Sequence, residues 1–112
     1  MHSTRNFVLR IVLLLSLILS ITEALTCKTC ERTDPSCTTP SVNEVHQCEH
    51  ADDVCYSWFH RTIDTTVQRG CMSTNSVEYT IIKDMINHHN QGCVKRMRAF
   101  NCFTFCSFDL CN

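Results

Sequence analysis

The chain has 112 residues, ten of them cysteines, and a formal net charge of −1. About 9 % cysteine in so short a chain is typical of a secreted disulfide scaffold, and two glycines and two prolines exclude collagen-like and Pro/Gly-rich disordered proteins. The length allows one small domain, and the weak net charge excludes the electrostatic footprint expected for nucleic-acid binding.

Residues 1–24 are predicted to be a signal peptide. Arg5 and Arg10 supply a positive n-region, residues 11–21 form an apolar run interrupted only by two serines, and Thr22-Glu23-Ala24 is a small-x-small cleavage site. The apolar run is too short to span a bilayer, which needs about 20 residues. Cleavage after Ala24 leaves residues 25–112 as one domain that keeps all ten cysteines and has a net charge of −2.

The predicted signal peptide sends the chain into an oxidising compartment, where an even number of cysteines pairs into disulfides. A lipid anchor would need a spacer and a hydrophobic tail after Cys111, and the sequence shows neither. We therefore expect a secreted, extracellular monomer without a lipid anchor, in a small disulfide-rich all-β fold.

Residues 54–71 are predicted to form a β-hairpin. The first strand, 54–61, is rich in aromatic residues, and the second, 66–71, alternates apolar and polar positions. A turn is expected at 62–65, although it lacks the Asn-Gly or Asp-Gly signal of tight hairpins.

Residues 77–87 fit either a helix or a strand. Apolar residues recur there at offsets of three and four, Ser76 is a candidate N-cap, and β-branched residues argue for a strand instead. We favour a short helix. A strand is expected at residues 94–100, where Lys95, Arg96 and Arg98 are interpreted as a solvated face rather than as an anion-binding patch.

The cysteines gather at both ends of residues 25–112, which indicates a cross-linked hub from which two long loops project. Their spacing alone leaves hundreds of pairings open. Cys27-x-x-Cys30 and His46-x-x-x-His50 also fit zinc-site spacings, but disulfides and surface histidines are the favoured interpretation in a secreted chain. We expect no metal and no cofactor.

Catalysis is not expected, because an enzyme needs a nucleophile and a base that converge on one pocket. The cysteines are assigned to disulfides. Ser57 and His60 are three residues apart on the expected strand, so their side chains point to opposite faces.

Binding is the favoured function, and the candidate contact residues lie in the expected hairpin. Tyr56, Trp58 and His60 share one strand face, and Phe59 lies on the other. Tyr56 and Phe59 are expected to pack internally. Trp and Arg are enriched in binding hot spots, so Trp58 and the adjacent His60 and Arg61 are the leading candidates, joined by Asp64 in the turn.

The cysteine framework and its flanking residues resemble the lymphocyte-antigen-six/urokinase-receptor superfamily, the three-finger proteins that include snake α-neurotoxins. The matching motifs are Leu-x-Cys-x-x-Cys at residues 25–30, Cys55-Tyr56, Arg69-Gly70-Cys71, and the final Cys106-x4-Cys111-Asn112. The resemblance covers nearly all of residues 25–112. One departure is that Phe103-Thr104-Phe105 separates two cysteines that are usually adjacent in the family.

The resemblance implies a three-finger fold with a five-disulfide hub, in which the final Asn112 makes hydrogen bonds. It implies fingers at Lys28–Gln47, Tyr56–Gly70 and Met72–Gly92, the last with its return strand. The implied disulfides are Cys27–Cys55, Cys30–Cys37, Cys48–Cys71, Cys93–Cys102 and Cys106–Cys111.

The function that the resemblance implies is binding and modulation of a membrane receptor or ion channel through its extracellular part, with nicotinic acetylcholine receptors as one target class. The toxin-like tip is not matched, since Asp64 lacks the expected arginine shortly after it. The alternative is an extracellular organiser of cell–cell contact or epithelial barrier assembly.

Overall fold

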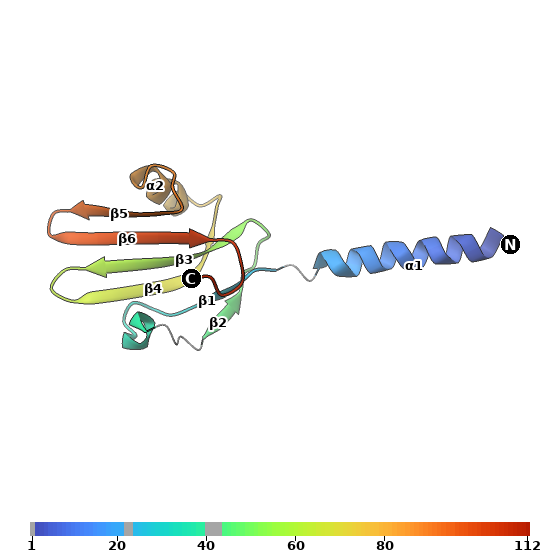
Figure 1. The fold of residues 1–112 in the computed structure, drawn as a ribbon, viewed down its shortest axis with the longest axis horizontal. Coiled ribbons are helices and arrows are strands. Elements are labelled where there is room, and N and C mark those ends of the chain that lie inside the picture. The colour runs from blue at the N-terminus through green and yellow to red at the C-terminus, as the bar shows by residue number, and fades with distance from the viewer. Residues whose placement is uncertain (1, 22–23, 40–43) are drawn as a thin grey trace.

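The computed structural model describes residues 2–21, 24–39 and 44–112, and it consists of a helix followed by two antiparallel sheets (Figure 1). The helix, α1, spans His2–Ile21, and a short 3-10 helix, η1, spans Pro35–Thr38. The small sheet pairs β1 (Thr26–Lys28) with β2 (Val45–Gln47). The larger sheet has the order β4–β3–β6–β5, made of β3 (Asp53–Arg61), β4 (Thr65–Ser73), β5 (Gln91–Arg96) and β6 (Ala99–Cys106).

Helix α1 projects away from the sheets, and its apolar side chains between residues 7 and 15 are exposed, among them Phe7, Leu13 and Leu14. Across the described residues, the structure contains no helix with the length and apolar character that membrane crossing requires. Thr22 and Glu23 of the predicted cleavage site lie outside the described residues, as do positions 40–43 of the loop between β1 and β2.

Strands β3 and β4 confirm the hairpin predicted over residues 54–71. Cys55 pairs with Cys71 at one end and Arg61 with Thr65 at the other. The turn between the strands is closed by the Thr62 N–H, which donates to the carbonyl oxygen of Asp64 over 3.0 Å.

The strand predicted at residues 94–100 is wrong, because a turn at Met97-Arg98 divides it between β5 and β6. Met97 takes a φ of 54°, in the left-handed region that glycine or asparagine usually occupies. The long loop expected at 72–92 contains α2 (Val77–Met85), as the predicted short helix requires. The second long hairpin is β5–β6, and residues 74–90, between the end of β4 and the start of β5, form the connection that carries α2.

Helix α2 spans Val77–Met85 and confirms the helical interpretation of residues 77–87. The Ser76 side chain accepts a hydrogen bond from the Tyr79 N–H, as an N-cap residue does. The helix packs on one face of the larger sheet, where buried Ile86, just after its last residue, contacts Phe103 and Phe105 of β6.

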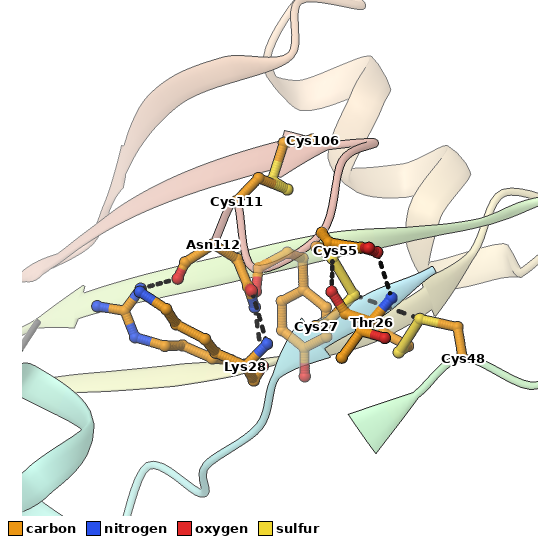
Figure 2. The surroundings of a disulfide bond; sticks show 12 residues. Thr26, Cys27, Lys28, Cys48, Cys55, Cys106, Cys111 and Asn112 are labelled. Carbon is orange, nitrogen blue, oxygen red and sulfur yellow. Dashed lines mark hydrogen bonds between the residues drawn. A yellow bond between two sulfur atoms is a disulfide. The ribbon is translucent and has the colours of Figure 1, made fainter. Parts of the chain in front are cut away.

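Five disulfides join the described chain, and they are the same five pairs that the family resemblance implies: Cys27–Cys55, Cys30–Cys37, Cys48–Cys71, Cys93–Cys102 and Cys106–Cys111. Two of them meet in a buried hub between the sheets, where the sulfurs of Cys27 and Cys48 lie 3.3 Å apart (Figure 2). The inserted Phe103-Thr104-Phe105 is accommodated as strand, with both phenylalanines buried under α2.

Asn112 also stabilises the hub, through hydrogen bonds to three strands. Its amide nitrogen donates to the backbone carbonyls of Lys28 (2.9 Å) and Tyr56 (2.8 Å), and its amide oxygen accepts from the Lys28 N–H (2.9 Å). The Asn112 backbone carbonyl accepts from the Arg69 guanidinium over 2.5 Å. One buried residue therefore ties β1 to both β3 and β4.

Replacing Asn112 tests whether its hydrogen bonds stabilise the hub. Asn112→Ala leaves the Lys28 N–H and the backbone carbonyls of Lys28 and Tyr56 without these partners, and a buried unsatisfied polar group costs about 1–3 kcal/mol. We expect the free energy of unfolding, measured by denaturant titration with disulfides intact, to fall by about 2 kcal/mol or more. The exposed control Asn75→Ala should cost under about 1 kcal/mol. An equal loss of unfolding free energy in the two variants would contradict this stabilising role of Asn112.

Candidate binding surface

Three side chains on the helix-covered face of the larger sheet form a hydrogen-bonded unit. The Trp58 indole N–H donates to Oδ1 of Asn101 over 2.9 Å, and Nδ1 of His60 lies 2.6 Å from the same oxygen. The rings of Trp58 and His60 meet edge to face at 5.6 Å between centroids. The register of the β3–β6 pair brings these side chains together, because Asn101 of β6 pairs directly with His60 of β3.

This arrangement assigns the tautomer of His60. An indole N–H can only donate, so the oxygen of the Asn101 amide must face Trp58. The same oxygen faces His60, and therefore Nδ1 of His60 carries a proton and donates it. In the neutral ring Nε2 is then the acceptor, and His60 offers a partner a lone pair rather than an N–H.

Trp58 is half-buried, and its ring has two neighbouring partners. It stacks on Phe103 at 6.0 Å between centroids, and the Arg32 guanidinium lies 5.4 Å from its ring centre. The ring is thus prearranged, which lowers the conformational entropy lost when a partner binds. It also contributes to internal packing, so its truncation would affect folding as well as binding.

A cleft of about 250 Å³ opens between α2 and the sheet beside Trp58. It is lined by Tyr56, Trp58, Gln68, Met72, Glu78, Ile82 and Phe103. The Tyr56 hydroxyl accepts a hydrogen bond from the Gln68 amide over 2.9 Å, and burial raises the pKa of the phenol. The phenol is therefore a neutral group at physiological pH.

A second group of exposed residues lies at the end of the larger sheet where its two hairpin turns lie side by side (Figure 1). Ile63 in the β3–β4 turn and Met97 in the β5–β6 turn are each 100 % exposed. Arg61 and Asp64 flank Ile63 and are exposed as well. We call this end of the sheet, residues 61–65 and 95–100, the tip surface.

The four contact residues expected from the sequence are therefore divided between two places. Trp58 and His60 lie together on the face of the larger sheet that α2 covers, whereas Arg61 and Asp64 belong to the tip surface. Phe59 points to the opposite face and packs with Val67 and the Cys30–Cys37 disulfide, as expected. Sequence reasoning missed Asn101, Ile63 and Met97, because their roles depend on pairing between distant strands and on a turn without glycine.

A cluster of three sulfurs, from Cys27, Cys48 and Cys71, is the one group among the described residues with metal-binding spacing. All three sulfurs belong to disulfides, so no thiolate is present to coordinate an ion. The cluster is the structural hub.

The position of α2 over the sheet depends on Gly92. A Cβ built at this position would lie 2.7 Å from Cβ of buried Ile86, closer than packed atoms come, whereas at Gly70 the nearest atom is a Tyr56 ring carbon at 3.2 Å. We expect Gly92→Ala to lower the free energy of unfolding by about 1–3 kcal/mol through overpacking. Gly70→Ala is the matched control and should cost less in the same denaturant titration. A larger loss at Gly70 would contradict this account of the helix position.

No protein-family model and no curated protein matches this sequence. The small, disulfide-rich β architecture is therefore established by the chain itself, through its five disulfides and its strand pairing.

Proposed function

We propose that the chain is a secreted three-finger protein of the lymphocyte-antigen-six/urokinase-receptor superfamily. The disulfide pairs and the hydrogen bonds of Asn112 support this assignment, because both agree with what the family pattern implies. In this assignment the fingers are the β1–β2 loop, the β3–β4 hairpin and the β5–β6 hairpin. The exposed apolar helix α1 serves as the signal peptide that is removed.

The proposed activity is binding to the extracellular part of a membrane receptor or ion channel, with nicotinic acetylcholine receptors as the first class to test. A rigid hub that projects exposed hairpin turns is suited to recognition, since binding residues are commonly carried on loops held by a rigid scaffold. The chain needs no cofactor or catalytic group for such a role.

One observation carries the proposal most directly, the complete exposure of Ile63 and Met97 on neighbouring turns. A large apolar side chain in water gains about 1.5–3 kcal/mol when it is buried, so two of them at one end favour association with a partner. Met97 also holds a left-handed φ of 54°, and strained backbone of this kind concentrates at functional sites.

Trp58 and His60 extend this contact surface along β3. His60 presents an acceptor nitrogen, and Trp58 presents the part of its indole that Phe103 and Arg32 leave uncovered. Arg61 and Asp64 supply opposite charges beside Ile63, which would orient the partner rather than add much affinity.

The test uses an apolar residue at each end of the domain. Ile63→Ser removes the tip residue, and Phe108→Ser is a matched control, since Phe108 is 69 % exposed near the hub. Fluorescently labelled protein is titrated onto cells that display a nicotinic acetylcholine receptor and onto cells that lack it. We expect saturable, receptor-dependent binding that Ile63→Ser weakens about thirtyfold, as loss of a hot spot of about 2 kcal/mol does, and that Phe108→Ser leaves within twofold.

Binding that is equal for both variants would exclude the tip surface. Absence of receptor-dependent binding would exclude this receptor class. If the protein instead causes cells without the receptor to adhere to one another, the alternative role as an organiser of cell–cell contact is favoured.

A further inference from the structure

We propose that one face of the tip surface is a separate binding site for a sulfated polysaccharide. The proposal is based on a hollow of about 390 Å³ that is bordered by the cations Arg61, Lys95 and Arg98. Phe100 and Thr62 are among its other lining residues. The site rests on the extracellular location proposed above, because that is where sulfated polysaccharides occur. Of the three cations of the site, Arg61 is also among the residues proposed above to contact the receptor, whereas Lys95 and Arg98 are not.

Strand register creates this arrangement. Phe100 of β6 pairs with Arg61 of β3 on one side and with Lys95 of β5 on the other. Directly paired residues of antiparallel strands point to the same face, so the two cations flank the Phe100 ring on adjacent strands. Neighbouring strands lie about 4.8 Å apart, which places the Arg61 and Lys95 backbones roughly 10 Å from each other. Arg98 approaches from the β5–β6 turn.

The cations of the site are available to an external anion. Arg61, Lys95 and Arg98 are exposed, and the ion pair that the described residues contain joins His88 to Asp84 instead. Within the described chain, the side chains of these three residues also make no hydrogen bond. Each could therefore pair with an anionic group without breaking an internal contact.

The distribution of charge favours an anionic partner, although the whole chain has a net charge of only −1. The tip surface holds four cations, Arg61, Lys95, Arg96 and Arg98, against the single acid Asp64. The opposite end of β3 follows the acidic residues Glu49 and Asp52 and begins at Asp53. The domain is thus charge-separated, and such a field steers a polyanion towards the tip surface.

The shape and chemistry of the hollow select a sulfated sugar chain among anionic partners. Phe100 is 41 % exposed between the cations, so a pyranose ring can lay its C–H face against the aromatic ring while its sulfate groups reach Arg61 and Lys95. A guanidinium pairs with an oxyanion through two parallel hydrogen bonds, which suits a sulfate ester as well as a phosphate. A linear polymer can lie in a hollow on the face of a sheet, whereas a flat bilayer surface cannot enter it.

The test measures binding of the full chain, purified with its disulfides intact, to a heparin-derived octasaccharide. The double variant Lys95→Ser/Arg98→Ser removes two cations of the site. Lys28→Ser/Lys83→Ser removes the same charge elsewhere and is the matched control. We expect the first pair to weaken binding at least tenfold and the control pair less than threefold. Affinity for the octasaccharide should also fall steeply as salt is raised.

Two further arms identify the source of the anion. Chemically desulfated octasaccharide should show no measurable binding, and vesicles that contain phosphatidylserine should not compete with the sulfated probe. The proposal is overturned if both double variants weaken binding equally, if desulfated sugar binds as well, if the vesicles displace the octasaccharide, or if the octasaccharide does not bind. Because Ile63→Ser retains all the cations, it should bind the octasaccharide normally, and this separates failure of this site from failure of receptor binding.

Discussion

The contact between the Cys27–Cys55 and Cys48–Cys71 disulfides is the constraint on which the rest of the structure depends. The two bonds lie side by side with the Cys27 and Cys48 sulfurs 3.3 Å apart, and they join the small sheet to β3 and β4 of the larger one. The fully buried side chains of the described residues are cysteines, namely Cys27, Cys37 and Cys55. A domain of this size buries too little apolar surface for comfortable stability, and each of these cross-links removes about 3–4 kcal/mol of unfolded-state entropy.

Fixing one end of the sheet leaves the other end free to carry function. The hub and Asn112 hold the strands where β3 begins, and the hairpin turns lie at the far end with Ile63 and Met97 exposed. Helix α2 gives the sheet its second point of packing, on the face that carries Trp58. The opposite face at the tip is left open, and the cations gather there. One scaffold thus presents an apolar end and a basic face that different partners could occupy.

Local signals in the sequence were sufficient for the elements with a clear period or cap. The β3–β4 hairpin follows from aromatic and alternating residues, and α2 follows from its apolar spacing and the Ser76 cap. The turn at Met97 was missed because none of the usual turn residues stands there, and its left-handed backbone is imposed by the pairing of β5 with β6. The disulfide pairs could be anticipated only through the family resemblance, since spacing alone leaves too many combinations.

The candidate sites were harder to predict than the fold for a related reason. Trp58, His60 and Arg61 could be selected from one strand, but alternation sends Arg61 to the other face, away from the first two. Asn101 is 41 positions from His60 in the sequence and meets it only through the β3–β6 register. The β3–β6 and β5–β6 registers together place Arg61 and Lys95 on either side of Phe100, a juxtaposition that the spacing within one strand does not reveal.

Disulfide mapping of the purified chain under non-reducing conditions tests the central claim most directly. The account predicts a mass ten hydrogens below that of the fully reduced chain, and linked peptides that contain Cys27 with Cys55 and Cys48 with Cys71. A free thiol, or a peptide in which Cys48 is linked to Cys55, would contradict the hub and the placement of both hairpins that depends on it.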